Sequence, residues 1–291
     1  MSDNAEHNVG TVEKGERYIS VEENVELRVL SYCQSTGTPG IPVLIISGLA
    51  TMVESFEQVI NELSKNSPVY FIETRDRHTS RIEGEAEYGI PAMGRDIVKI
   101  VEALGLKERN YVLMGYSFGA SIMSECYSLL REKPKCLIFM EPTPEFHYPG
   151  WSLIVIRLMG KPLYRILRPA AKWYMRSFYI NTAEDNEMAV ISGRSLDNAD
   201  PVKLINTILA IAPYKVWPKL DGLTCPSLVV GTSKDRLHVP EDILRMVGEL
   251  RDCTFIDMET NLRTHSTEMG SLVYNYIREL DSLPEQGISA T

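Results

Sequence analysis

Ser117 stands between two glycines, in the pattern Gly115-x-Ser117-x-Gly119, and this motif is the strongest chemical signal in the sequence. The apolar run Tyr111–Met114 precedes the motif and an amphipathic stretch follows it, which predicts a tight turn from a strand into a helix. Such a turn raises the serine hydroxyl above the sheet, and the N-terminus of the following helix favours developing negative charge. Ser117 is therefore the predicted nucleophile, and an incidental serine in a glycine-rich turn is the alternative.

The motif and the elements around it resemble the α/β-hydrolase superfamily, from about Ile41 to the C-terminus. Members of this superfamily carry a nucleophile, an acid and a base in that chain order, each in a loop after a strand. A serine hydroxyl is a poor nucleophile at neutral pH, so a neutral imidazole must take its proton during attack. The resemblance thus implies an acid and a histidine downstream of Ser117.

Asp235 fits the position of the acid that the resemblance implies. It follows the apolar run Leu228–Val230 and a glycine, and a proline comes shortly after it. A carboxylate there would orient the histidine and stabilise its imidazolium form. Glu141, at the end of the run Leu137–Met140, is the alternative acid, because some members of the superfamily carry the acid after that strand.

His265 is the histidine that the resemblance assigns as the base. It follows the last predicted strand, Thr254–Met258, and precedes a terminal helix. The chain order of Ser117, Asp235 and His265 agrees with that of the superfamily. The other histidines lie elsewhere, in the tail, in loops or at the start of the predicted lid: His7, His78, His147 and His238.

An acyl-transfer enzyme also needs two N–H donors that stabilise the oxyanion. The resemblance implies the backbone N–H of Phe118 as one donor and that of Leu49 as the other. Relatives usually have His-Gly before the second donor, whereas this chain has Ser47 and Gly48. The loop at residues 73–81 also departs from the Asp-x-x-Gly-x-Gly-x-Ser pattern of many relatives, since it contains neither glycine.

The elements that must position these residues are short apolar runs alternating with helical stretches. Continuous apolar runs are typical of parallel strands that are covered on both faces. The runs are Val43–Ile46, Val69–Ile72, Tyr111–Met114, Leu137–Met140 and Leu228–Val230, and the helices are Phe56–Leu63, Gly94–Leu104 and Ala120–Leu130. Two strands, Arg17–Ser20 and Val25–Tyr32, come before them. The alternation predicts an α/β fold with a doubly wound, mostly parallel sheet, of eight strands if the resemblance holds.

The alternation stops for more than eighty residues after the sixth predicted strand. We expect residues 1–15 to be a flexible tail, residues 16–141 and 226–291 to form the core, and residues 142–225 to form an inserted helical lid. A second independent domain is the alternative for this last segment. The lid is preferred because the order of strand and helix resumes after it.

The predicted lid contains a run of cations. Residues 151–176 include Arg157, Lys161, Arg165, Arg168, Lys172 and Arg176 and no acidic residue. Their spacing of three or four residues places them on one helical face, which either is simply solvated or contacts an anionic substrate, a carrier protein or a membrane surface. A second cluster, formed by Arg75, Arg77, His78 and Arg81, is expected to be a solvated loop, with an anion-binding loop as the alternative.

Composition limits the other possibilities. The net charge of −9 argues against nucleic-acid binding. The sequence has no apolar run long enough to cross a membrane and no signal peptide at its N-terminus, and its five cysteines lack CxxC spacing. We therefore expect a cytoplasmic protein without a metal or another cofactor.

The leading expectation is a serine hydrolase that cleaves a carboxylic ester or thioester of a small-molecule acyl substrate through an acyl-enzyme. The Gly-Tyr-Ser-Phe-Gly-Ala run is similar to that of many acyl thioesterases. The same triad could serve acyl transfer, C–C bond hydrolysis or a lyase reaction, since the lid and not the fold sets the substrate. A non-catalytic binding protein of the same fold is a further alternative.

Overall fold

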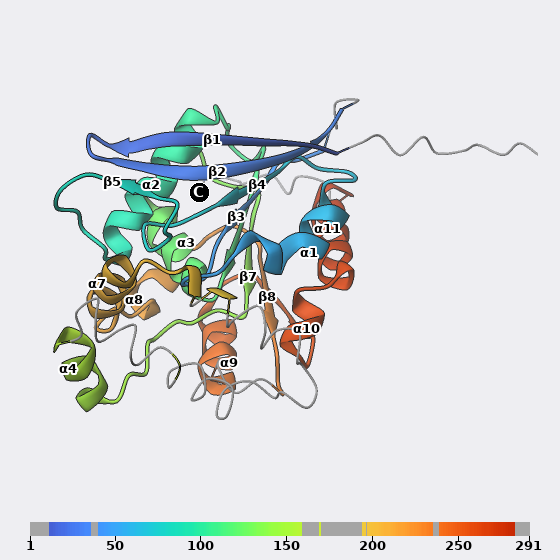
Figure 1. Cartoon of the computed structure of the whole chain (residues 1–291). Coiled ribbons are helices and arrows are strands. Elements are labelled where there is room, and N and C mark those ends of the chain that lie inside the picture. Colours follow the sequence, from blue (N-terminus) through green and yellow to red (C-terminus); the bar gives the residue numbers. More distant parts are fainter. Residues whose placement is uncertain are drawn as a thin grey trace, which may run out of the picture.

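A single twisted sheet lies at the centre of the computed structural model (Figure 1). The structure describes residues 12–35, 40–158, 169, 194–195, 197–234 and 239–282. The strands follow one another across the sheet in the order β1-β2-β4-β3-β6-β7-β8-β9, and the short β5 pairs with β2, which makes nine strands. Their bounds are Val12–Glu22 (β1), Val25–Gln34 (β2), Val43–Ile46 (β3), Val69–Ile72 (β4), Arg81–Ile82 (β5), Val112–Tyr116 (β6), Cys136–Met140 (β7), Ser227–Gly231 (β8) and Cys253–Asp257 (β9).

The six consecutive strands β4-β3-β6-β7-β8-β9 are parallel to one another, and β2 is antiparallel to β1, β4 and β5. The prediction of a mostly parallel sheet is therefore confirmed, with β5 as an addition. All residues of β3, β6, β7 and β8 are buried, as the continuous apolar runs predicted. Because these strands run in the same direction, the loops that follow them meet at one edge of the sheet.

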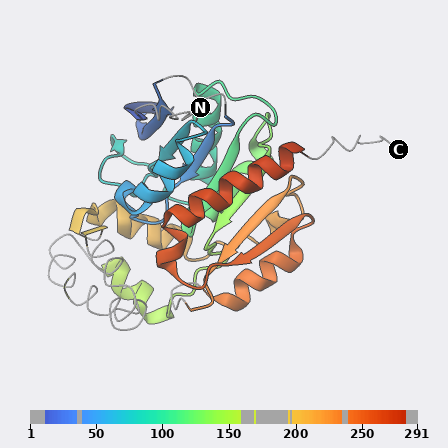
Figure 2. The same ribbon diagram turned by 90° about the vertical axis from the view of Figure 1, so that its right-hand side faces the viewer.

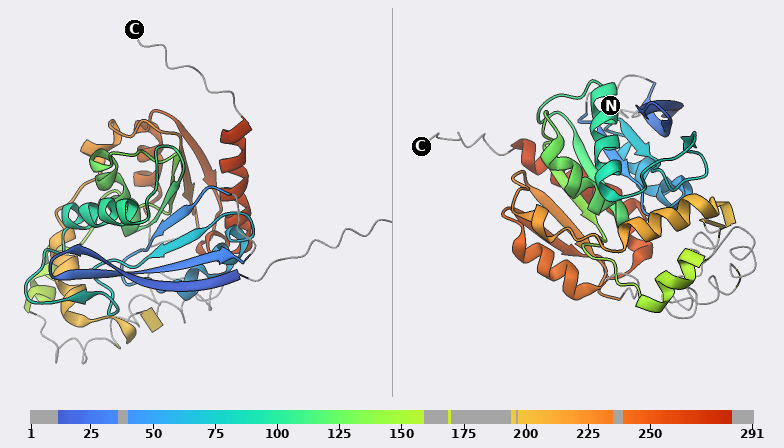
Figure 3. Two further views of the ribbon diagram at one scale, coloured as in Figure 1. Left: turned by 90° about the horizontal axis from the view of Figure 1, so that it is seen from above. Right: turned by 90° about the vertical axis from the view of Figure 1, so that its left-hand side faces the viewer.

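Helices cover both faces of the sheet. Their bounds are Glu57–Leu63 (α1), Ile90–Ala103 (α2), Phe118–Leu129 (α3), Gly150–Leu158 (α4), Pro201–Ile211 (α7), Trp217–Leu220 (α8), Pro240–Glu249 (α9), Asn261–Thr264 (α10) and Thr267–Ser282 (α11), with a 3-10 turn at Val53–Phe56 (η1). Figure 2 shows α1 and α11 on one face, and the right panel of Figure 3 shows α2, α3 and α9 on the other. No helix among the described residues is both long and apolar enough to span a membrane.

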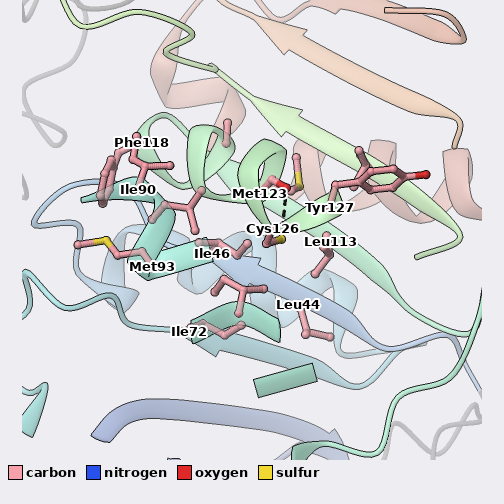
Figure 4. Packing of buried hydrophobic residues seen from close by; sticks show 14 of the residues in the cluster. Leu44, Ile46, Ile72, Ile90, Met93, Leu113, Phe118, Met123, Cys126 and Tyr127 are labelled. Carbon is pink, nitrogen blue, oxygen red and sulfur yellow. Dashed lines mark hydrogen bonds between the residues drawn. The ribbon is translucent and has the colours of Figure 1, made fainter. Parts of the chain in front are cut away.

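The two faces of the sheet contribute to two separate apolar cores. Leu44, Ile46 and Leu113 point toward α2 and α3, where they pack with side chains such as Met93 and Met123 (Figure 4). Alternate residues of the same strands, such as Ile45, Val112 and Met114, pack with α1 and α11. This alternation along a strand fixes the pairing register, because a slip of one residue would exchange the two faces.

Two boundaries differ from the predictions. The strand β1 begins at Val12, so residues 12–15 belong to the sheet and not to a tail, and Lys14 pairs with Tyr32 of β2. The helix α2 begins at Ile90, four residues before the predicted start at Gly94. In the first case the chain pairs with a neighbouring strand, which adds backbone hydrogen bonds that a polar sequence does not reveal.

The segment between β7 and β8 contains helices in its described part, namely α4, α7 and α8. The helix α7 returns the chain to the core, where its Leu204 packs with Ala50 in the loop after β3. Asp200 caps this helix, since its side chain accepts hydrogen bonds from the N–H groups of Val202 and Lys203. Most of the predicted basic face, from Lys161 to Arg176, lies outside the described residues.

Candidate active site

Ser117 connects β6 directly to α3 and has a strained backbone. Its φ of 49° and ψ of −111° lie far from the values that most residues with a side chain adopt. Its N–H donates to the carbonyl of Met140 at the end of β7, at 2.9 Å. This hydrogen bond helps to hold the strained turn, and the half-buried Ser117 side chain lies at the edge where the loops after the parallel strands meet.

The two glycines of the motif permit this turn through close packing. A Cβ on Gly115 would lie 2.6 Å from the Cα of Ala120, and one on Gly119 would lie 2.3 Å from the carbonyl oxygen of Ile46. Both neighbours are backbone atoms, which cannot move away as a flexible side chain could. The physical reason for the Gly-x-Ser-x-Gly pattern is thus present in the structure, and α3 begins in direct contact with the end of β3.

Unusual backbone conformations gather at this edge of the sheet. Among the described residues other than glycine, five have positive φ, and three of these follow adjacent strands: Ala50 after β3, Ser117 after β6 and Glu141 after β7. Their φ values are 54°, 49° and 46°. Strained residues of this kind persist only where the surrounding structure holds them, and they cluster at functional sites.

Thr143, in the loop after β7, contacts both Ser117 and the first turn of α3. The Oγ of Ser117 lies 3.1 Å from the Oγ1 of Thr143, and the N–H of Thr143 donates to the Ser117 carbonyl at 3.4 Å. Ser121, one turn along α3, donates its hydroxyl to the Thr143 carbonyl at 2.6 Å. Thr143 is a neighbour of the predicted nucleophile that the sequence analysis missed, because no motif marks it.

Glu141 is fully buried and ties the end of β7 to α10. Asn261 Nδ2 donates to Glu141 Oε2 at 2.6 Å, and the hydroxyl of Thr264 hydrogen-bonds to Oε1. The N–H of Glu141 donates to the carbonyl of Val230 in β8 at 2.8 Å. A buried carboxylate with these partners fixes the position of α10, and His265 is the residue directly after α10.

His265 is almost completely buried, with 5% of its surface exposed. Its Nδ1 lies 3.0 Å from the carbonyl oxygen of Asn261 and 3.2 Å from the hydroxyl of Thr264. A carbonyl oxygen can only accept a hydrogen bond, so the contact with Asn261 requires the ring proton on Nδ1. The lone pair of this tautomer is on Nε2, where it can take a proton from a nucleophile.

Aromatic rings hold the imidazole of His265 beside the turn that carries Ser117. The ring centroids of His265 and Tyr116 are 4.9 Å apart at an interplanar angle of 89°, and those of His265 and Phe56 are 5.0 Å apart. Tyr116 is the residue directly before Ser117. The structure therefore places the His265 ring against Tyr116, the residue adjacent to the predicted nucleophile, although His265 is far from both in the sequence.

The two predicted oxyanion donors lie on segments that are in close contact, the start of α3 and the loop after β3. Phe118 is the first residue of α3, where an N–H group has no partner within the helix. Leu49 lies in the loop after β3, within a turn in which the Thr51 N–H donates to the Gly48 carbonyl at 3.1 Å. A Cβ on Gly119 would lie 2.7 Å from the Ser47 carbonyl oxygen, which shows how close the first turn of α3 is to the loop after β3.

The expectation of a solvated loop after β4 is wrong for its two central arginines. Arg75 and Arg77 are 0% and 2% exposed. Arg75 donates to both oxygens of Asp96 at 2.6 Å and contacts Glu22 at the same distance. Arg77 donates to the Ala50 carbonyl at 2.6 Å. The loop is thus built into the core beside the loop after β3, and its charges meet protein partners.

Asp235, the predicted acid, lies outside the described residues, as does His238. The other predicted residues lie in segments that follow parallel strands or the short helix α10: Leu49 after β3, Ser117 and Phe118 after β6, Glu141 after β7 and His265 after α10. Asn261 and Thr264 contact Glu141 and His265. No signal in the sequence marked either residue beyond its position just before His265.

Comparisons with known proteins agree with this architecture. A family model described as "alpha/beta hydrolase fold" matches residues 41–186. A search of the curated proteins found no match to the chain.

Solved structures with the same fold include several hydrolases. A thermophilic esterase from Thermogutta terrifontis is 20% identical, with a TM-score of 0.75, over 91% of this chain and 99% of the other. An esterase from Exiguobacterium antarcticum is 15% identical, with a TM-score of 0.76, over 92% and 100%. The enol-lactonase from Burkholderia xenovorans is 14% identical, with a TM-score of 0.73, over 92% and 100%. At these identities the likeness shows the fold.

Proposed function

Because the chain belongs to the α/β-hydrolase fold family, we propose that it is a serine hydrolase that cleaves a carboxylic ester or thioester of a small acyl substrate. The observation that carries this proposal is the strained position of Ser117 between β6 and α3, with His265 packed against the adjacent Tyr116. A serine held in this way and a histidine whose ring proton is on Nδ1, so that Nε2 is the basic nitrogen, are the two groups that acyl transfer needs.

In the proposed reaction, Ser117 Oγ attacks the acyl carbon while His265 Nε2 takes the hydroxyl proton. The negative charge that develops on the acyl oxygen is stabilised by the N–H groups of Leu49 and Phe118. The bond to the leaving group then breaks, and the leaving group takes the proton from His265. Water attacks the acyl-enzyme next, giving its proton to His265, which returns the proton to Ser117 as the acid product leaves.

Asp235 is the proposed acid of this triad, on the strength of its sequence context alone. Glu141 is the alternative, and its observed contacts support a role in positioning His265 through Asn261 and Thr264. In either case the carboxylate would stabilise the imidazolium form of His265 without taking the proton.

A panel of substrates tests which acyl groups and leaving groups the protein accepts. The panel consists of p-nitrophenyl esters and acyl-CoAs of varied chain length, with an enol-lactone added because one structural neighbour is an enol-lactonase. Replacing Arg165, Arg168 and Lys172 together with glutamine tests the basic segment of the proposed lid. If the segment contacts an anionic substrate, KM for acyl-CoA should rise in this variant while KM for a neutral ester stays the same. Equal changes in the two KM values would mean that the basic residues are only solvated.

The nucleophile is tested with a fluorophosphonate probe, which labels an activated serine. Ser117→Ala is expected to abolish both labelling and ester turnover while the protein stays folded. The matched control is Ser124→Ala, which removes a buried hydroxyl of the same helix that bonds only locally, to the Ala120 carbonyl. Labelling that persists in Ser117→Ala, or a wild-type protein that turns over no member of the panel, would contradict the proposed function.

A further inference from the structure

The loop after β4 buries two adjacent charged residues, Asp76 and Arg77, against the loop after β3. Only 1% of the surface of Asp76 and 2% of that of Arg77 is exposed. Both side chains reach the same residue, Ala50, whose φ of 54° lies in the left-handed region. A residue with a side chain adopts this conformation at a cost, so the surrounding contacts must hold it there.

The contacts hold Ala50 from both sides. Its N–H donates to Asp76 Oδ2 at 2.6 Å, and its carbonyl accepts a hydrogen bond from Arg77 Nη1, also at 2.6 Å. The other carboxylate oxygen, Asp76 Oδ1, accepts a hydrogen bond from the Thr74 hydroxyl at 2.5 Å. Charged groups form the stronger hydrogen bonds of proteins, so both backbone groups of Ala50 have a fixed direction.

This fixed residue follows Leu49 directly. Leu49 and Ala50 are the two central residues of the turn from Gly48 to Thr51, which is closed by the hydrogen bond of 3.1 Å from the Thr51 N–H to the Gly48 carbonyl. The plane of a peptide bond does not bend, so the Leu49 N–H points opposite to the Gly48 carbonyl that accepts this bond. The peptide plane on the other side of Leu49 is held through the Ala50 N–H. The Leu49 N–H is therefore oriented by the turn and by the two charged side chains that hold Ala50.

The loop that carries Asp76 and Arg77 is itself hydrogen-bonded to the helix α7. Lys203 donates to the Ser80 carbonyl at 2.5 Å and to the Arg77 carbonyl at 3.2 Å. From the same helix, Leu204 and Ile208 pack in the small apolar cluster that contains Leu49 and Ala50. The loop after β3 thus contacts both α7 and the charged pair.

We propose that Asp76 and Arg77 are positioning residues that aim the Leu49 N–H into the oxyanion hole by holding both backbone groups of Ala50. This inference rests on the proposed function, in which Leu49 supplies one of the two donors. It assigns a role to the part of the loop at residues 73–81 where the sequence departs from the pattern of many relatives. It also explains why two charges are buried so close to a backbone turn.

The first test compares steady-state kinetics of Asp76→Ala, Asp76→Asn and Asp96→Asn with wild type on one p-nitrophenyl ester. Asp96 is the matched control, because it is an equally buried carboxylate that binds an arginine of the same loop, Arg75. Removing one oxyanion donor costs about 100- to 1,000-fold in kcat. In Asp76→Ala the Leu49 N–H is retained but its direction is no longer fixed. We therefore expect kcat to fall by about 10- to 100-fold, with little change in KM.

An inhibitor that forms a tetrahedral adduct distinguishes a change in the direction of the Leu49 N–H from a loss of protein stability. A trifluoromethyl ketone forms an oxyanion with the nucleophile, so its affinity should fall in Asp76→Ala by the same factor as kcat. Asp76→Asn keeps an oxygen that can accept from the Ala50 N–H, so it should recover most of the loss. Asp96→Asn should lower the melting temperature while kcat and inhibitor affinity of the folded protein stay near those of wild type.

The second test is hydrogen exchange at residues 47–51 in the resting protein, which needs no turnover. We expect the Ala50 amide to exchange at least about tenfold faster in Asp76→Ala, the size that one lost hydrogen bond can produce, and to be unchanged in Asp96→Asn. If Asp76→Ala does not fold, Thr74→Val removes one donor to the carboxylate and should give smaller changes of the same sign.

These outcomes distinguish the two proposals. The positioning role of Asp76 would be overturned if the Ala50 amide exchanged at the wild-type rate in Asp76→Ala, or if kcat of Asp76→Ala were no lower than that of Asp96→Asn. Neither result would contradict the proposed hydrolase activity. A wild-type protein without ester turnover would overturn the proposed function, and the exchange experiment would still decide whether Asp76 holds the loop.

Discussion

Glu141, the residue directly after β7, accepts a hydrogen bond of 2.6 Å from Asn261, and this contact ties the end of β7 to α10, the short helix directly before His265. The two residues are 120 positions apart in the sequence. The position of the proposed base is thus set by a buried carboxylate on a neighbouring strand as well as by the chain around it.

Asp235→Asn and Glu141→Gln together decide which carboxylate acts as the acid. Loss of the charge that stabilises the imidazolium costs about 10⁴-fold in kcat in serine proteases, so we expect a loss of that order in Asp235→Asn. Glu141→Gln keeps an oxygen that can accept from Asn261 and should lower kcat by less than about tenfold, as for a neutral hydrogen bond. Near-normal turnover in Asp235→Asn with a large loss in Glu141→Gln would transfer the role to Glu141.

Thr143→Val tests the hydroxyl that lies 3.1 Å from Ser117 Oγ. Valine has nearly the same shape but no hydroxyl, so the substitution removes the contact with Ser117 and leaves the packing. Since a neutral hydrogen bond contributes about 0.5–1.5 kcal/mol, we expect the rate of fluorophosphonate labelling to change by about two- to tenfold. Thr143→Ser keeps the hydroxyl and serves as the control. Equal labelling rates in all three proteins would mean that the contact does not orient Ser117.

Gly119→Ala tests the close approach of α3 to the end of β3. The added Cβ would meet backbone oxygens of Ile46 and Ser47, so the helix must shift, and we expect a loss of about 1–3 kcal/mol in the free energy of unfolding. The control is Gly248→Ala in α9, where nothing lies within 4 Å of the new Cβ. There the substitution should stabilise the helix by up to about 1 kcal/mol. Urea unfolding of both variants gives the comparison, and a neutral effect of Gly119→Ala would be inconsistent with the observed packing.

The pH dependence of stability tests the environment of Asp76. Burial raises the pKa of its carboxyl above the ordinary value of 3.8, against the opposing hydrogen bonds from Thr74 and Ala50 and the charge of Arg77. The folded protein therefore holds this proton to a higher pH than the unfolded chain does. The resulting stabilisation is complete below the unfolded pKa and is lost as the pH rises through the folded pKa.

Asp76→Asn lacks this titration. The free energy of unfolding of wild type minus that of the variant should therefore be largest at low pH and should decrease as the pH rises, as measured by urea unfolding across the acid range. The difference between wild type and Ser124→Ala, which removes no titrating group, should stay constant. A difference for Asp76→Asn that grows with rising pH would mean that the pKa of Asp76 is lowered in the folded protein.

The sequence predicted the elements of the sheet well, because strands such as β3 and β7 are buried on both faces and must be continuously apolar. The turn at Ser117 was equally predictable, since two backbone contacts exclude any residue but glycine at Gly115 and Gly119. Both features depend on neighbours within a few residues or on a repeated pattern, and such signals can be seen in a single sequence.

The loop after β4 shows what a single sequence does not reveal. Charged residues in a loop are usually solvated, but Arg75 finds Asp96 on α2 and Glu22 on β1, and Arg77 finds the backbone of Ala50. These partners come together only when the sheet forms. For the same reason, no local pattern indicated Thr143 or Asn261 as neighbours of the candidate site.

The left-handed residues Ala50, Ser117 and Glu141 have a consequence for protein engineering. Each strained residue costs on the order of 1–3 kcal/mol, so glycine at these positions would relieve strain that the proposed chemistry needs. A selection for heat resistance alone would therefore favour substitutions at this edge of the sheet and would drift toward robust but inactive proteins. Libraries that hold these three positions constant would force the gain in thermal tolerance to come from the rest of the molecule.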